Sequence, residues 1–232
     1  MVAEAQMGAP AGGNSAGGGT SPRAGTNWTR LAALTGVVFA VALAASVVGN
    51  NEPSSTASAA KVAHYYLVHK HAVNMRALFG AAAVLFGLGF FSYLRTYLRL
   101  VSSHAVTGLY FTGVLVFAVG GVIGAGMQFT LGDSPKSLSP DSLQTLNVLD
   151  RDLTWPILSI GLALMYLALG ILVVRSRIVP VWLGWLAIVV AIAGGSLFLA
   201  FVPLLVTPVW VLVVSIVMAV RNPRLSEELA RA

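Results

Sequence analysis

The sequence predicts an all-α fold, a polytopic transmembrane helical bundle of about six spans with both termini on the cytoplasmic side. Three observations predict it. The chain of 232 residues is 57% hydrophobic and only 9% charged, whereas a soluble domain carries roughly 25% charged residues. It contains six long apolar runs without Asp, Glu, Lys or Arg. Its Lys and Arg residues are divided unevenly between the two ends of these runs.

The first segment, residues 1–27, is rich in Gly, Ala, Ser and Pro and has no hydrophobic periodicity. A segment of this composition buries too little apolar surface to offset the entropy lost on ordering. We therefore expect a disordered N-terminal tail that ends where the first apolar run begins.

Each apolar run has about the ~20 residues with which a helix crosses a ~30 Å hydrocarbon layer. Helices are expected because backbone amides in lipid must pair within the segment and the runs lack the alternation of a barrel strand. The expected spans cover residues 31–48, 77–94, 105–127, 156–174, 181–199 and 203–220. For the first run, a signal peptide cut near Ala44–Ser46 stays an alternative, although the run is longer than the usual ~7–15 residues.

The orientation follows from the basic residues, which gather on the cytoplasmic side of membrane proteins. Of the 14 Lys and Arg residues, nine lie on the side of the termini and short connections, leaving five on the other side. The nine are Arg23, Arg30, Arg95, Arg99, Arg175, Arg177, Arg221, Arg224 and Arg231. We therefore expect both termini, including the tail 221–232, in the cytoplasm.

Two longer segments, residues 50–76 and 128–155, are expected outside. Nothing from residue 57 to residue 94 breaks a helix. Such a helix of about 55 Å, at 1.5 Å per residue, exceeds the bilayer, so its first part must stand above the membrane, lie on it or bend. In the second segment, prolines predict an irregular first half, one or two helical turns follow over Asp141–Asp152, and a new helix begins at Trp155-Pro156.

Polar side chains collect at the expected outer ends of spans two, three and four, and they form the candidate site. They are His71, Asn74, Arg76, Gln128, Asp150, Asp152 and Trp155. We expect Arg76 to pair with Asp150 or Asp152 and so to hold the two outer segments together. The set is either a ligand pocket that opens outward or an interfacial ion pair that contributes little stability, and the structural alternative is favoured.

No cofactor or metal is expected. Cysteine is absent, and His64, His69 and His71 lack the i, i+4 spacing with which a helix holds zinc. Nucleic acid is not expected either, because the basic residues sit at helix ends rather than in a stripe. Membrane lipid is the expected partner, and a protein partner or a second copy of the chain stays open.

Three segments carry a resemblance: Trp28-Thr-Arg30-Leu-Ala-Ala-Leu-Thr-Gly36, Ser58-Ala-Ala-Lys-Val-Ala-His-Tyr-Tyr66 and Pro180-Val-Trp-Leu-Gly-Trp185. With the layout of spans, they make residues 28–220 similar to a group of bacterial six-span membrane proteins classed as a domain of unknown function. The resemblance implies six helices and a bacterial plasma membrane location. It implies no activity and no functional residue.

Three functions are compatible with these residues. The first is an accessory or sensing subunit without catalytic activity, whose outer segments recognise a partner or small ligand. The second is a transporter of small molecules or lipid, with an apolar cavity lined by Phe198, Phe201 and Trp210. The third, an enzyme at the outer interface that uses His71 with Asp150 or Asp152, is the least favoured, because no motif in the chain commits to a chemistry.

Overall fold

The computed structural model describes residues 23–48, 51–99, 103–177, 180–196 and 201–229, and this part of the chain is helical without strands. Three of its helices are long and apolar enough to cross a membrane, namely Ala59–Thr96, His104–Asp133 and Pro140–Ser176. Three shorter apolar helices are Ala33–Val47, Val181–Gly195 and Phe201–Val217. The all-α prediction is confirmed, and each expected span falls on one of these six helices; residues 197–199 of the fifth lie outside the described part.

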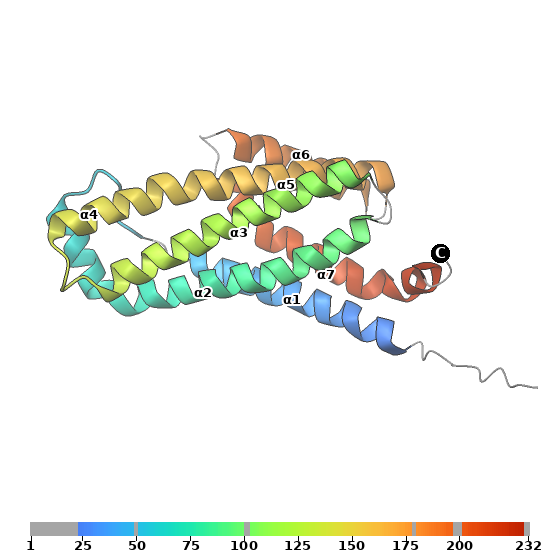
Figure 1. Cartoon of the computed structure of the whole chain (residues 1–232), viewed down its shortest axis with the longest axis horizontal. Coiled ribbons are helices and arrows are strands. Elements are labelled where there is room, and N and C mark those ends of the chain that lie inside the picture. Colours follow the sequence, from blue (N-terminus) through green and yellow to red (C-terminus); the bar gives the residue numbers. More distant parts are fainter. Residues whose placement is uncertain (1–22, 49–50, 100–102, 178–179, 197–200, 230–232) are drawn as a thin grey trace, which may run out of the picture.

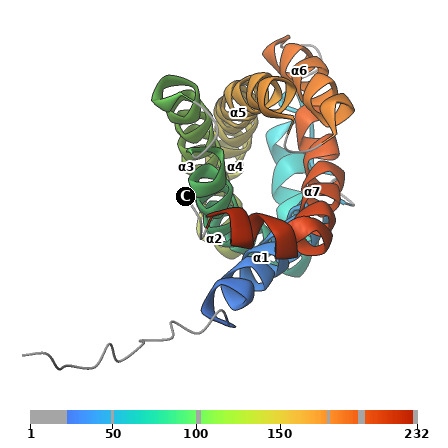
Figure 2. The ribbon, with the colours of Figure 1, turned by 90° about the vertical axis from the view of Figure 1, so that its right-hand side faces the viewer.

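The main helices form an elongated bundle (Figure 1). They are α1 (Arg23–Val47), α2 (Ala59–Arg99), α3 (His104–Asp133), α5 (Trp155–Ser176), α6 (Val181–Gly195) and α7 (Phe201–Leu229). Viewed end-on, they follow one another around a ring in chain order, and α7 returns to pack on α1 (Figure 2). The core of the ring is aromatic and aliphatic, with Phe39, Phe91 and Phe117 in edge-to-face contact.

Glycines bring α3 and α5 into close contact. A Cβ added at Gly113 would collide with the backbone of Met165, and one added at Gly161 would collide with the backbone of Phe117. Farther along α3, a Cβ at Gly124 would lie 2.7 Å from Cγ2 of Thr154. We name this contact between Gly113 and Gly161 the glycine seam. Glycine at these two positions lets the backbones of α3 and α5 approach closely.

Helix α2 contains a bend at His69, whose φ of −103° and ψ of 17° depart from helical values. The His69 Nδ1 lies 3.0 Å from the carbonyl oxygen of Tyr65, the group that the His69 amide would bond in a regular helix. Because a carbonyl only accepts, this bond requires the proton on Nδ1. The two rings also stack, with centroids 4.5 Å apart. The long helix expected from residue 57 onward is thus observed, and it bends.

The segment before α5 is more helical than expected. Helix α3 continues to Asp133, α4 spans Pro140–Leu149, and a π-helical turn over Asp150–Thr154 leads without a break into α5. In a regular helix, the ring of Pro156 would clash with the carbonyl of the residue four positions before it. The wide π turn lies directly before this proline and changes the local register. The irregular part therefore shrinks to residues 134–139.

At the end of the bundle that carries α4, residues 51–76 and 131–154 form a cap with its own small core. Six side chains from both segments are buried together there: Ala57, Val62, Tyr66, Val73, Leu131 and Leu143. Figure 1 shows α4 beside the first turns of α2 at this end. The two longer connections are therefore packed structure rather than open loops.

The two expected tails differ from the observed helices. Helix α1 begins at Arg23 and α7 ends at Leu229, so residues 23–27 and 221–229 are helical where tails were expected. Residues 1–22 and 230–232 lie outside the described part. The terminal helices are thus longer than their apolar runs.

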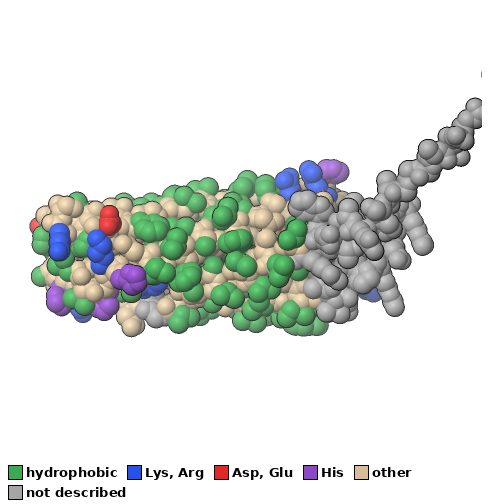
Figure 3. All heavy atoms as spheres, turned by 90° about the horizontal axis from the view of Figure 1, so that it is seen from below, with side chains coloured by type: hydrophobic (Ala, Val, Ile, Leu, Met, Phe, Trp, Pro, Cys, Tyr) green, Lys and Arg blue, Asp and Glu red, His purple; other side chains and the backbone are tan. Residues whose placement is uncertain are grey.

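Hydrophobic side chains cover the middle of the bundle, as Figure 3 shows for one face. Among the exposed ones are Leu85, Val119, Val122, Ile160, Val189 and Ile192. On this face, Lys, Arg and His side chains gather toward the two ends, and acidic side chains toward the end that carries the cap. An apolar girdle between charged ends is the surface that a membrane protein presents to lipid.

Candidate functional site

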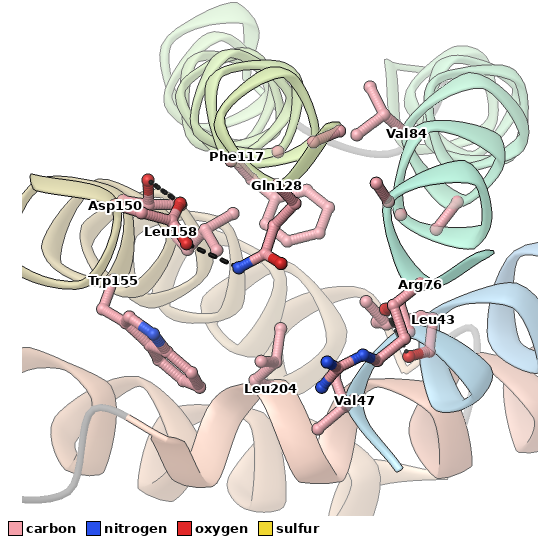
Figure 4. Close-up of a pocket in the computed structure, with 18 of the residues that line it drawn as sticks. Leu43, Val47, Arg76, Val84, Phe117, Gln128, Asp150, Trp155, Leu158 and Leu204 are labelled. Carbon is pink, nitrogen blue, oxygen red and sulfur yellow. Dashed lines mark hydrogen bonds between the residues drawn. The ribbon is translucent and has the colours of Figure 1, made fainter. Parts of the chain in front are cut away.

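A cavity of about 140 Å³ lies directly beneath the cap, between α1, α2, α3, α5 and α7. Its walls toward the bundle are apolar and include Leu43, Val47, Val84, Phe117, Leu158 and Leu204 (Figure 4). Its other end is polar and contains Glu52, Arg76, Gln128, Asp150, Thr154 and Trp155. We name these six residues the polar end of the cavity.

Small residues keep the cavity open. Gly80, Gly121 and Gly124 line it together with several alanines. A Cβ added at Gly80 would meet no atom within 4 Å. At Gly80 the space therefore exists because no side chain fills it, whereas a Cβ at Gly121 or Gly124 would collide with Val84 or Thr154.

Asp150 is the buried carboxylate of the polar end, with 8% of its surface exposed. It accepts hydrogen bonds from Gln128 Nε2 at 2.6 Å and from the Thr154 hydroxyl at 3.2 Å. Burial raises the pKa of Asp150 from 3.8 to about 6; the Gln128 bond opposes this rise, and the nearby Glu52 carboxylate adds to it. The π turn places this carboxylate outside the expected span 156–174, at the junction of cap and bundle.

Arg76 and Glu52 form the ion pair of the polar end, with Nη1 and Oε1 3.5 Å apart. Their side chains are only 11% and 15% exposed. Arg76 also donates to the Tyr65 hydroxyl at 3.0 Å. The expected partner was Asp150 or Asp152, whereas the carboxylate found in this ion pair is Glu52, because residues 51–58 lead back from α1 across the start of α2.

Gln128 provides an acceptor without a partner. Its Nε2 donates to Asp150, and its buried Oε1 has no hydrogen-bond partner among the described residues. In Figure 4 this oxygen points away from Asp150 into the space between Arg76 and Leu204. A buried polar atom left without a bond costs about 1–3 kcal/mol, so this oxygen is a natural contact for a bound donor.

The two cap segments are joined by other residues than Arg76. The buried Tyr66 hydroxyl donates to Asn147 Oδ1 at 2.7 Å, and burial raises the pKa of Tyr66. Asn147 Nδ2 and Arg151 Nη1 both donate to the carbonyl of Pro53, at 3.4 and 3.2 Å. The expected link between the outer segments thus exists, but Asn147 and Pro53 form its centre.

Of the seven candidate residues, four come together around the cavity: Arg76, Gln128, Asp150 and Trp155. The other three do not line it: His71 and Asp152 are exposed, and Asn74 lies half-buried against Gly132. Asp152 instead borders a shallow groove on α4 with Asp141.

Sequence reasoning missed Glu52 and Thr154. The signal for Glu52 was available, because it is the one acidic residue between positions 50 and 76. Thr154 had no such signal, since its contact with Asp150 depends on the π turn.

The apolar cavity expected around Phe198, Phe201 and Trp210 is not the cavity found. Phe198 lies outside the described residues, and Phe201 is 49% exposed. Trp210 is buried and packs edge-to-face on Tyr166, with centroids 5.6 Å apart. Tyr166 donates to Thr207 at 2.9 Å. This part of the bundle is packed core.

Comparison with protein families, curated proteins and solved structures gave no match for this chain. The resemblance to bacterial six-span proteins therefore stays a prediction, and a function of the site is inferred from its geometry.

Proposed function

We propose that this chain is a multi-pass protein of the bacterial plasma membrane that binds a small amphipathic ligand in the cavity beneath its cap, as an accessory or sensing subunit. The observation that carries the proposal is a cavity with apolar walls and one polar end. Ligand sites in proteins combine these features: mostly apolar lining with a few placed polar groups.

The membrane location is supported by the apolar girdle and by the charges at the ends. Arg99, Arg175 and Arg177 are exposed at the end away from the cap, on the side where basic residues predominate in the sequence. By the positive-inside rule this end faces the cytoplasm. The cap then lies outside, and six crossings leave both termini inside.

The location is tested by cysteine labelling, because the chain has no cysteine of its own. Asp152→Cys and His104→Cys place single thiols at exposed positions of opposite ends. With a membrane-impermeant maleimide, we expect Cys at 152 to react in intact spheroplasts and Cys at 104 to react only after lysis. The reverse order, or equal reaction in intact spheroplasts, contradicts the proposed topology.

The size of the cavity supports binding of a compact molecule. An apolar cavity of ~150 Å³ in another protein binds benzene, and the cavity here has about 140 Å³. On the bundle side of it, Phe39 packs on Phe91 and Phe117 with centroids 5.3 and 6.4 Å apart. This aromatic packing beneath the cavity favours binding over passage through the bundle.

Binding is tested with 2-phenylethanol, a neutral probe with a compact apolar body and a hydroxyl group. We expect the wild-type protein in detergent to bind it by isothermal titration calorimetry, and Gly80→Leu to weaken binding at least tenfold by filling the cavity. Gly89→Leu is the matched control: a Cβ there also meets no atom within 4 Å, and the residue does not line the cavity. No binding, or equal binding by both variants, overturns the proposal.

A further inference from the structure

The polar end of the cavity presents a hydrogen-bond acceptor that no described residue uses, the Oε1 of Gln128. It contains the carboxylates of Glu52 and Asp150 and the carbonyl oxygen of Gln128. Gln128 Nε2 and the Thr154 hydroxyl donate to Asp150, and Arg76 contacts Glu52 through Nη1 and Tyr65 through Nη2. A ligand that supplies a donor can satisfy the Oε1 of Gln128.

The polar end carries a net negative charge when its carboxylates are ionised. When both carboxylates are ionised, Glu52 and Asp150 carry two negative charges against the single positive charge of Arg76. Arg76 lies in an ion pair with Glu52, which reduces its attraction for a further anion. The hydrogen bonds that Asp150 accepts come from neutral groups. In a buried environment, a carboxylate of this kind gains most from a nearby cation.

Trp155 adds a surface suited to a cation. It lines the cavity directly after the π turn, and Figure 4 shows its indole ring extending from below Asp150 toward α7. Ammonium groups are attracted to the face of an indole ring. The carboxylate of Asp150 and the ring of Trp155 thus border one corner of the cavity, and the Oε1 of Gln128 faces the neighbouring space toward Arg76 and Leu204.

From this arrangement we propose that the cavity binds a primary ammonium group on a compact apolar body, with the ammonium at the Asp150 carboxylate beside Trp155 and the body against Val84, Phe117 and Leu204. The inference rests on the proposed function and names its ligand class. A primary ammonium brings a positive charge and three N–H donors to a carboxylate whose observed hydrogen bonds come from neutral groups. A carboxylate ligand would face Asp150 without a partner.

The experiment compares three probes with the same phenyl body: 2-phenylethylammonium, 2-phenylethanol and 3-phenylpropanoate. Affinities are measured at pH 8 for the full chain in phosphatidylcholine nanodiscs. We expect the ammonium to bind at least tenfold more tightly than the alcohol, and the carboxylate to bind most weakly. Equal affinity of ammonium and alcohol overturns the inference and leaves the proposed function intact. Binding by none of the probes overturns both.

Variants locate the binding group. Asp150→Asn keeps the shape and an acceptor for Gln128, and it should lower the ammonium affinity about tenfold while leaving the alcohol affinity within twofold. Asp152→Asn is the matched control, because it removes the same charge two residues away from an exposed side chain. Loss of ammonium affinity in both variants to the same extent points to the overall charge of the cap and contradicts the inference.

A second substitution guards against a folding defect. Gln128→Met removes the amide while keeping a side chain of similar length, and it should weaken the ammonium more than the alcohol. If each of the two variants weakens the ammonium and the alcohol to the same extent, the charge of the ligand is not recognised or the cavity has collapsed. Either result overturns the inference.

The ammonium group has two sources, a free amine or the headgroup of phosphatidylethanolamine. Nanodiscs with and without this lipid distinguish them. Weaker binding of 2-phenylethylammonium in the presence of phosphatidylethanolamine shows that the headgroup competes for the same corner. Unchanged binding shows a site for free amines. Both results keep the ammonium chemistry, whereas an increase in 3-phenylpropanoate affinity above that of the ammonium in either disc overturns it.

Discussion

The glycine seam and the cavity use the same kind of residue to opposite effect. At the seam, Gly113 and Gly161 let α3 and α5 approach until their backbones touch. At the cavity, Gly80 faces a space in which an added Cβ meets no atom within 4 Å. A glycine in a helix therefore has one of two effects. Where the neighbouring helix packs against it, the two backbones come into contact, and where no group packs against it, an empty space remains.

Close packing of α3 on the π turn and α5 continues from the glycine seam up to the cavity. A Cβ added at Gly120 would lie 2.9 Å from Cγ2 of Ile157, and one added at Gly124 would lie 2.7 Å from Cγ2 of Thr154. The unfilled space therefore lies on the side of α2, where Gly80 faces the cavity.

The largest loss of stability is expected from a substitution in the glycine seam. In Gly161→Ala, the new methyl group collides with the backbone of Phe117, which cannot move aside as a side chain does. Overpacking a core costs about 1–3 kcal/mol, and we expect the upper end of this range or more because the obstacle is backbone. The measurement is thermal unfolding in detergent, together with the yield of monodisperse protein.

Gly126→Ala is the control for that variant. A Cβ at Gly126 meets no atom within 4 Å, and alanine favours a helix over glycine by up to about 1 kcal/mol. Its melting temperature should equal or slightly exceed that of the wild type. If Gly161→Ala melts at the same temperature as Gly126→Ala, the seam does not hold the two helices together.

The burial of Asp150 beside the cavity should give a smaller effect, which is a pH-dependent difference in stability between the wild type and Asp150→Asn. The pKa of Asp150 is about 6 in the fold against an ordinary value of 3.8, so the folded protein binds this proton more tightly than the unfolded chain. The stability that this group contributes is present below about pH 4 and is lost as the pH rises through 6. Asp150→Asn, which cannot ionise, should therefore be more stable than the wild type at pH 8, by up to about 3 kcal/mol.

The measurement is the difference in melting temperature between wild type and Asp150→Asn from pH 4 to pH 8. This difference cancels the contributions of the ionisable neighbours that both proteins share, namely Glu52, Arg76 and Tyr66. The advantage of Asn should be absent at pH 4, grow as the pH rises toward 6 and stay constant above it. An advantage that is constant with pH, or a loss at pH 8, shows that Asp150 is stabilised as an anion and is not penalised by its burial.

Much of the fold was predictable because its signal is local. Uninterrupted apolar runs specify helices whatever surrounds them, and the tertiary structure changed their limits by only a few residues in most cases. The exceptions are the ends. Residues 23–27 and 221–229 extend α1 and α7 although their composition is polar and Pro223 lies in the second of them.

The site was predictable only in part, because it depends on which side chains face inward from each helix. Arg76, Gln128, Asp150 and Trp155 are polar or aromatic groups at the expected ends of spans, and depth alone brought them together. The choice between Asp150 and Asp152 was not predictable, because the π turn decides which of them faces inward. Glu52 was overlooked because it follows a span, whereas the carboxylates considered as partners of Arg76 precede one.

The π-helical turn over Asp150–Thr154 affects which sequence changes the cap can accept during evolution. Each residue inserted into a helix rotates the rest of that helix by about 100°, and the wide turn absorbs such an offset between α4 and α5. The buried face of α4 in the cap and that of α5 in the bundle are thereby uncoupled. New cap surfaces can accordingly arise by substitution along α4, while the register of the membrane-facing helix below stays as it is.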